Sequence, residues 1–156
     1  MEPGDVVVRI AGARDVSAIA TLRSLWHSGS DEPELEHRIA DWLAADGARR
    51  TVWLASSTDV PIGMASVFEY RRMPRPGRPD SRWGYVSNMF VRAECRNQGV
   101  GSRLVACIIA AAEDRGYVRL VVSPSQRALT FYRRAGFIVP DETAGEHRLL
   151  VRPIPT

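Results

Sequence analysis

A glycine-rich loop, Arg96 to Ser102 (RNQGVGS), joins a segment typical of a strand to a segment typical of a long helix. The preceding residues, Tyr85 to Val91, are rich in β-branched and aromatic side chains, which favour a strand. The apolar positions that repeat at helical spacing after the loop, before a stop at Gly116, are Leu104, Val105, Ile108, Ile109 and Ala112. Glycine lets a ligand approach the backbone, and the first N–H groups of a helix attract anions because they have no intrahelical partner. The sequence therefore predicts a strand, a phosphate-binding loop and a helix, in that order.

Two nucleotide-binding motifs do not fit this loop. A Walker loop ends in Gly-Lys-Ser/Thr, and the chain contains no lysine. The dinucleotide fingerprint needs a third glycine, where Leu104 stands, and a carboxylate about 20 residues further on, where the chain is apolar. The spacing that remains, Arg-x-x-Gly-x-Gly, resembles the pyrophosphate-binding motif of the GNAT family of N-acetyltransferases.

A second motif strengthens this resemblance. After an apolar run suited to a buried strand, Val118 to Val122, comes the segment Ser123 to Phe137 (SPSQRALTFYRRAGF). It is similar to the family's short helix, which carries a tyrosine, here Tyr132, and is closed by a glycine, here Gly136. The resemblance covers residues 51 to 139 well. It implies an α/β (α+β) fold, with one GNAT-like domain over residues 1–156 and a mixed central sheet of about seven strands flanked by about four helices.

The remaining elements are predicted from periodicity and from capping signals. Two helices are expected, one capped by Asp15 and running to about His27, the other starting at Asp31 or Glu32 and ending at Gly47. The other expected strands are Val6 to Ile10, Thr51 to Ala55, Ile62 to Tyr70, one from about Phe137, and His147 to Arg152. The predicted order is β-α-α-β-β-β-α-β-α-β-β.

Composition excludes several classes of protein. A length of 156 residues fits one domain, and a net charge of +3 without a basic stripe argues against a nucleic-acid partner. The two cysteines, Cys95 and Cys107, cannot form a disulfide framework, and no zinc-ligand spacing is present, so no metal is expected. The N-terminus lacks a signal-peptide pattern. We therefore expect a cytoplasmic protein without a membrane partner, and leave a homodimer open.

The resemblance also implies a cosubstrate, acetyl-CoA, and the residues that bind it. In the family, backbone N–H groups of the strand before the loop, here Met89 to Val91, hold the acetyl and pantetheine portions. The pyrophosphate would bind the loop, here Arg96, Asn97, Gln98, Gly99, Val100, Gly101 and Ser102. Ser125 stands where many relatives have an asparagine that touches the cofactor, so this contact is expected to be weaker or absent. Tyr132 matches the tyrosine that protonates the departing thiolate.

The proton acceptor is left open by the sequence. An alkyl amine with a pKa near 10.4 must lose a proton before it attacks a thioester. Some family members carry a glutamate at the position of Tyr85, and no carboxylate stands there. Glu69 could act as the general base instead if its side chain faces the cleft. The alternation of side chains along a strand does not decide whether Glu69 faces the cleft or the solvent. Deprotonation through water, assisted by backbone carbonyls or by Ser87 and Asn88, is the second alternative.

Two charged segments bear on the acceptor. The basic connector Arg71 to Arg82 is either a lid that recognises an acidic acceptor or a solvated loop. The acidic segment Ser30 to Glu36 is either a rim that binds a cationic amine or a helix cap. His27, His37 and His147 are scattered and carry no role.

We expect an acetyl-CoA-dependent N-acetyltransferase acting by direct attack on a primary amine of a small molecule, with Tyr132 as general acid. A protein amine acetyltransferase and a non-catalytic acyl-CoA sensor module remain as alternatives.

Overall fold

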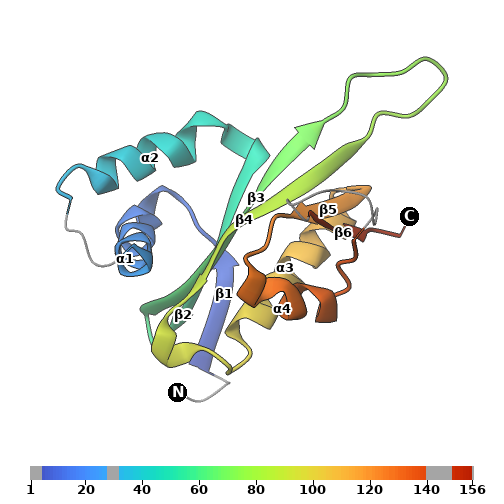
Figure 1. Ribbon diagram of the computed structural model, residues 1–156. Helices are drawn as coiled ribbons and strands as arrows, with labels where there is room; N and C mark the ends of the chain where they lie inside the picture. Colours follow the sequence, from blue (N-terminus) through green and yellow to red (C-terminus); the bar gives the residue numbers. More distant parts are fainter. Residues whose placement is uncertain (1–4, 28–31, 140–148, 156) are drawn as a thin grey trace. The chain divides into compact units, whose positions relative to one another are not determined.

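The computed structural model describes residues 5–27, 32–139 and 149–155 (Figure 1). The helices and strands follow the predicted order, except for the strand expected from Phe137. The helices are η2 (Ala13–Asp15), α1 (Val16–Trp26), α2 (Leu35–Ala45), η3 (Gly47–Arg49), η4 (Ala93–Cys95), α3 (Val100–Asp114), η5 (Gln126–Ala128) and α4 (Leu129–Arg134), where η marks a 3₁₀ turn. The strands are β1 (Val6–Ile10), β2 (Arg50–Ser57), β3 (Val60–Arg71), β4 (Arg82–Val91), β5 (Arg119–Val122) and β6 (Leu150–Pro153).

The strands form one mixed sheet in the order β1-β2-β3-β4-β5-β6. Strand β1 is antiparallel to β2 and β5 to β6, whereas β4 and β5 are parallel. A parallel neighbour needs a crossover connection, and α3 lies between β4 and β5 in the chain. The mixed α/β fold with four α-helices is therefore confirmed for the described residues.

The described residues form six strands, against the predicted count of about seven. The strand expected from Phe137 is reduced to a single bridge between Ile138 and Val151, whose two N–H···O bonds are both 2.8 Å long. Strand β6 pairs with β5 along its length and meets Ile138 only through this bridge, so the described residues before position 140 are too few for a further ladder. The beginning of the other strand, predicted from His147, lies outside the described residues.

Residue contacts divide the chain into two compact units. Unit 1 comprises Met1–Ser66 and Asn88–Cys107, and unit 2 comprises Val67–Ser87 and Ile108–Thr156. In unit 1, the apolar faces of α1 and α2 pack on residues from three strands. This core contains Ala11, Ile19, Ala20, Leu22, Ile39, Val52, Leu54, Met64 and Phe90. The spacing of Ile19 and Leu22 on one helical face explains why that face is buried.

Asp15 precedes α1 as predicted, but it does not cap the helix with its side chain. Its carboxylate instead accepts two hydrogen bonds from Arg9, at 2.8 and 2.9 Å, and one from the Gly12 N–H at 2.8 Å. The hydrogen bonds from Arg9, with that from Gly12, outweigh burial and lower the pKa of Asp15 to about 2. Asp15 therefore ties the start of α1 back to β1.

The second helix begins later than predicted, at Leu35. The Leu35 N–H donates to the Glu32 carbonyl at 3.1 Å, so the residues around Pro33 form a turn before the helix. Asp31, the other predicted start, lies outside the described residues. In the described part of the acidic segment, Glu34 makes no side-chain capping bond, Glu36 lies in the first turn of α2, and Glu32 pairs with Arg38 at 2.6 Å.

A buried glycine in unit 2 gives a first test of the packing. A Cβ built on Gly84 of β4 would lie 2.9 to 3.0 Å from Val67, Leu120 and Tyr117. Gly84→Ala is therefore expected to lower the free energy of unfolding by about 1–3 kcal/mol, the usual cost of overpacking, as measured by urea denaturation. Gly12→Ala is the matched control, because a Cβ there meets nothing within 4 Å. Equal stabilities of the two variants would contradict the packing described.

Candidate active site

The predicted phosphate-binding loop has the backbone conformation that such a loop needs. Asn97 and Gly99 have φ angles of 62° and 83°, in the left-handed region. The chain then turns into α3, whose first helical hydrogen bond runs from the Arg103 N–H to the Gly99 carbonyl at 3.0 Å. The N–H groups from Val100 to Ser102 consequently have no partner within the helix. A Cβ on Gly99 would meet nothing within 4 Å, so the space beside the loop is open to an anion.

Two side chains of the loop brace it against the segment before it. The Arg96 Nε donates to the Val91 carbonyl at 3.0 Å, and the Gln98 Nε2 donates to the Glu94 carbonyl at 3.1 Å. Both side chains belong to exposed residues. Arg96 therefore supports the loop through Nε, and its guanidinium carbon lies 5.9 Å from the centre of the Phe90 ring.

Strand β4 changes its conformation at Asn88, just before the predicted main-chain donors. Asn88 has a φ of 55°, and its side-chain Oδ1 accepts a hydrogen bond from Ser66 Oγ at 2.7 Å. The register between β4 and β5 ends two residues earlier, at Val86. A single left-handed residue within a strand redirects the residues after it, as at a β-bulge.

The main-chain groups of Met89 and Val91 face away from β3. The Arg92 N–H donates to the Ile62 carbonyl of β3 at 2.8 Å. Successive residues of a strand turn their main-chain groups to alternate sides, so those of Val91 and Met89 point to the other side. The Val91 carbonyl accordingly accepts its bond from Arg96 and not from β3. Met89 and Val91 are thus the residues of this segment whose N–H groups are free of the β3 ladder.

Tyr132 lies on α4 and is 3% exposed. Its ring packs edge-on against Phe131 and Phe137, with ring centroids 5.0 and 5.4 Å apart. Burial raises the pKa of the Tyr132 hydroxyl to about 12. The hydroxyl therefore keeps its proton throughout the physiological range, as a proton donor must.

Glu69 lies on β3 and is buried, with an exposed fraction of 5%. Its carboxylate accepts hydrogen bonds from Arg71 Nε at 2.8 Å and from the Tyr117 hydroxyl at 3.0 Å, and Arg82 lies 3.8 Å away. Burial by itself raises the pKa of Glu69, but the bonds from Arg71 and Tyr117 outweigh burial and hold this pKa below its ordinary value. Glu69 is therefore a charged residue in a donor-rich environment, with low basicity.

The other predicted site residues lie beside η5 and on β4. Ser125 is exposed at the start of η5, where its carbonyl accepts the Ala128 N–H at 3.0 Å. Tyr85 is half-buried on β4. Tyr132, Glu69 and Ser125 belong to unit 2, whereas the glycine loop, Met89 and Val91 belong to unit 1.

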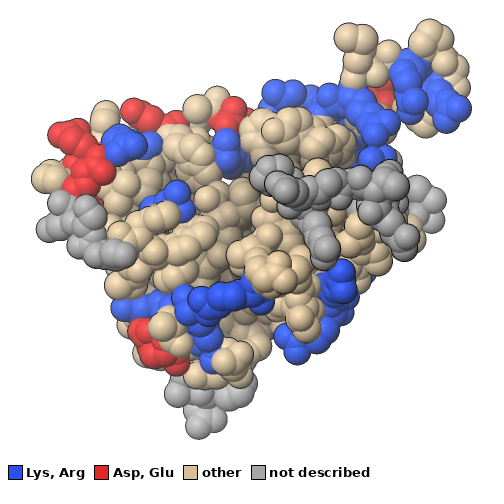
Figure 2. Space-filling view, viewed as in Figure 1, with Lys and Arg blue, Asp and Glu red and all other residues tan. Residues whose placement is uncertain are grey.

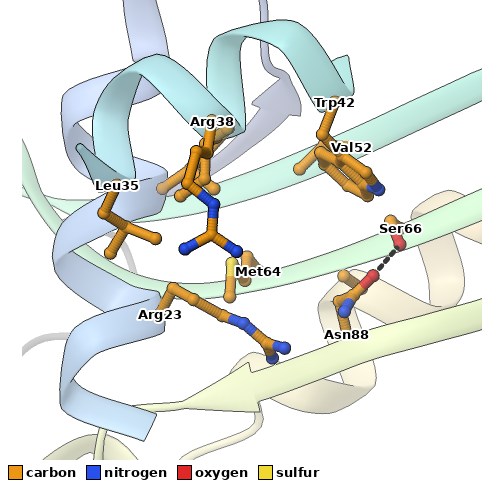
Figure 3. A pocket seen from close by; sticks show the side chains of 11 residues that line it. Arg23, Leu35, Arg38, Trp42, Val52, Met64, Ser66 and Asn88 are labelled. Carbon is orange, nitrogen blue, oxygen red and sulfur yellow. Dashed lines mark hydrogen bonds between the residues drawn. The ribbon is translucent and has the colours of Figure 1, made fainter. Parts of the chain in front are cut away.

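A cavity of about 260 Å³ lies within unit 1 (Figure 3). Its walls come from α1, α2 and strands β2 to β4. The described residues that line it are Ile19, Arg23, Leu35, Arg38, Ile39, Trp42, Val52, Met64, Ala65, Ser66 and Asn88. Figure 3 shows Arg38 reaching from α2 toward Met64, and Arg23 reaching from α1 toward Asn88. The cavity thus combines an apolar wall with two guanidinium groups, and it includes the residue next to Met89.

The sequence predictions missed Arg23, Arg38 and Trp42. A signal was present, because Arg23 comes four residues after the buried Ile19 and Arg38 three residues after Leu35. Residues at these spacings share one face of a helix. This spacing places both arginines beside apolar residues of the unit 1 core.

The basic connector extends beyond the ends of β3 and β4 (Figure 1). Residues 72–80 are exposed, and the Arg72 N–H donates to the Ser81 carbonyl at 3.0 Å, which closes the base of the loop. Figure 2 shows its basic side chains gathered on this loop.

Among the described residues, no helix is long and apolar enough to cross a membrane, and no group of three His, Cys, Asp or Glu could hold a metal ion.

Comparison with known proteins defines the class of this chain. The model of the acetyltransferase (GNAT) family matches residues 16–137, which include the glycine loop and Tyr132. The chain therefore belongs to the acetyltransferase (GNAT) family, and the resemblance found in the sequence is confirmed.

Individual relatives are distant. A glucosamine 6-phosphate N-acetyltransferase of Trypanosoma brucei brucei is 26% identical over 137 residues, which cover 85% of this chain and 89% of the relative. A predicted acetyltransferase with acetyl-CoA from Clostridium acetobutylicum is similar in structure, with a TM-score of 0.69, 20% identity, and coverage of 88% of this chain and 92% of that one. An acetyltransferase of the GNAT family from Streptococcus pneumoniae has a TM-score of 0.73 at 16% identity and covers 96% of this chain and 99% of its own. These structural likenesses concern the fold.

Proposed function

We propose that the protein is an acetyl-CoA-dependent N-acetyltransferase that moves an acetyl group to a primary amine of a small molecule. The observation that carries this proposal is the glycine loop, with its left-handed Gly99, its open space and the unpartnered N–H groups at the start of α3. Membership of the acetyltransferase family supplies the chemistry that such a loop serves. The thioester of acetyl-CoA supplies the activated acetyl group when it is bound.

Three sets of groups would bind different parts of acetyl-CoA. The N–H groups between Gln98 and Ser102, with Arg96, would hold the pyrophosphate, since backbone donors and an arginine both suit phosphate oxygens. The main-chain groups of Met89 and Val91 would hold the pantetheine amides and the acetyl carbonyl. Preorganised N–H donors of this kind also stabilise the oxyanion that forms when an amine attacks. Ser125 would add a minor contact from η5.

Tyr132 would serve as the general acid toward the departing thiolate. An ordinary thiol has a pKa of about 8.5, well below the pKa of about 12 of the buried Tyr132, so complete proton transfer from Tyr132 to the thiolate is unfavourable. The hydroxyl would instead donate a hydrogen bond to the negative charge that develops on sulfur. Tyr132 would therefore act late, by a hydrogen bond that strengthens as the carbon–sulfur bond breaks.

The geometry around Glu69 favours water as the proton acceptor. A general base works best with a pKa near the operating pH, and two donors hold the pKa of Glu69 below its ordinary value. Water near Ser87 and Asn88 is the other acceptor that the sequence left open. We propose that the acceptor amine loses its proton to water, and that Glu69 neutralises Arg71 within unit 2.

Glu69→Gln separates these roles. We expect the variant to lose stability, because the Arg71 guanidinium loses a charged partner, while the pH–rate profile keeps its shape. Thermal unfolding and initial rates from pH 6 to 10 are the measurements. Asp46→Gln is the control, since it breaks a comparable carboxylate–arginine pair, with Arg50 at 2.7 Å, in unit 1. A rate that falls at neutral pH and recovers at high pH would assign the base to Glu69 instead.

The function itself is tested by release of coenzyme A thiol from acetyl-CoA in the presence of amines. The panel contains two matched pairs: glucosamine with glucosamine 6-phosphate, the latter suggested by the trypanosomal relative, and pentylamine with 5-aminopentanoate. It also contains a peptide with a free α-amine and a lysine. Amine-dependent thiol release with a small amine supports the proposal. Transfer only to the peptide would favour a protein acetyltransferase, and acetyl-CoA binding without transfer to any amine would favour a sensor module.

The cavity favours the small amine over the protein amine. Its volume is about 260 Å³. This is below the usual range for drug-sized ligands, so a compact acceptor fits it better than a peptide segment does.

A further inference from the structure

The cavity in unit 1 has an unbalanced charge. Among the described residues that line it, Arg23 and Arg38 are charged and none is acidic. Two guanidinium groups that face one space repel each other, and of the two Arg23 is partly buried whereas Arg38 is exposed. A bound anion relieves this repulsion. The lining is therefore better suited to an anion than to a second cation.

The two arginines differ in how they are held. The Arg23 guanidinium carbon lies 4.8 Å from the centre of the Trp26 ring, and no described carboxylate lies within ion-pair distance of this residue. The Arg38 Nη1 contacts the Glu32 Oε1 at 2.6 Å, in a pair that is largely exposed. Glu32 thus offsets part of the charge of Arg38 from outside the cavity lining, and Arg23 contributes its full charge.

The remaining walls define what else the ligand carries. Leu35, Ile39, Trp42, Val52 and Met64 form an apolar surface, and the hydrogen-bonded pair of Ser66 and Asn88 provides a polar one. Asn88 is adjacent to Met89, the first of the main-chain donors assigned above to the acetyl carbonyl. An acceptor that fills the cavity would therefore lie within reach of this part of β4.

We propose that this cavity selects acceptor amines that also carry an oxyanion, either a phosphate monoester or a carboxylate, and that Arg23 and Arg38 bind this oxyanion. Guanidinium forks match the planar oxygens of a carboxylate and the oxygens of a phosphate. The inference rests on the proposed function and names the substrate class of the same site. It also assigns the charge recognition to α1 and α2 rather than to the basic connector between β3 and β4.

The test uses the two matched amine pairs with the wild-type protein and four variants. Arg23→Gln and Arg38→Gln are each expected to raise the KM for the anionic amine about 10- to 100-fold, the effect of losing a hydrogen bond to a charged group. The KM for the neutral amine and the kcat for both should stay within about twofold. Arg49→Gln is the matched control, because this exposed arginine on η3 does not line the cavity.

Glu32→Gln distinguishes recognition from structural damage. Arg38→Gln and Glu32→Gln break the same ion pair but change the charge at the cavity in opposite directions. We expect Glu32→Gln to lower the KM for the anionic amine about two- to fivefold, the size typical of one exposed charge. Changes in the same direction for both variants would show that only the ion pair matters, and would overturn the inference.

The outcomes for the wild-type protein separate the two proposals. A preference of at least ~10-fold for the anionic member of a pair supports the inference, and the pair that shows it identifies the phosphate or the carboxylate as the source. Equal or better transfer to the neutral amines overturns the inference and leaves the proposed function standing. If no amine is acetylated, calorimetry with glucosamine 6-phosphate and 5-aminopentanoate decides. Binding that weakens in Arg23→Gln then supports the inference without the proposed function, and absence of binding overturns both.

Discussion

Replacing Tyr132 by phenylalanine is expected to lower kcat about 10²- to 10⁴-fold, the usual contribution of a positioned general acid. The aromatic ring keeps its edge-on packing against Phe131 and Phe137, so the fold should be preserved. In the proposed mechanism the hydroxyl acts when the carbon–sulfur bond breaks, so it is expected to contribute little to binding in the ground state. The affinity for acetyl-CoA, measured by calorimetry, should therefore change little.

Tyr117→Phe provides the control for this experiment. It also deletes a buried tyrosine hydroxyl in unit 2, one that donates to Glu69 at 3.0 Å, but no part in the chemistry is assigned to it. We expect it to lose stability and to keep its turnover. Because the pKa of Tyr132 is about 12, the wild-type rate should show no decline from ionisation of this group below about pH 11. Wild-type turnover in Tyr132→Phe, under conditions where the chemical step limits the rate, would remove the acid assignment.

The second large effect is expected from Gly101→Val. Gly101 lies in the first turn of α3. A branched side chain there is expected to keep a phosphate from approaching the helix N–H groups. Each charge-assisted hydrogen bond lost costs about 1.5–3 kcal/mol, so the Kd for acetyl-CoA should rise about 10- to 100-fold or more by calorimetry.

The fold of this variant should not suffer. Valine has a higher helix propensity than glycine, so the substitution does not weaken α3 through propensity. Ala106→Val, at an exposed position of the same helix, controls for a branched side chain away from the loop. An unchanged Kd in a folded Gly101→Val protein would move the pyrophosphate away from this loop.

Local features of the fold were predictable because they depend on neighbours in the chain. The loop between β4 and α3 is marked by two glycines and by a change from strand-like to helical periodicity, and α3 begins at Val100, within the predicted loop. The short helix with Tyr132 was predictable for the same reason. The turn before Leu35 was not, because the acidic residues and Pro33 fit a first helical turn equally well.

Features that depend on distant residues were not predictable. Alternation along β3 could not decide where Glu69 points, because one of its partners, Tyr117, lies 48 residues away. The cavity likewise needs side chains from two helices and three strands, and Arg23 and Arg38 come to line one space only in the folded chain. The positive φ of Asn88 had a weak sequence signal, since asparagine is enriched in this conformation.

The left-handed Asn88 and the outward-facing residues after it have a consequence for how this protein can change over time. The direction of the N–H groups of Met89 and Val91 is set by the bond from Arg92 to Ile62 and by the local backbone, and not by the two side chains themselves. Any residue except proline can supply such a donor. Under the proposed function, selection at these two positions is therefore expected to act on backbone conformation rather than on residue type. Substitutions of their side chains should leave the two donors in place.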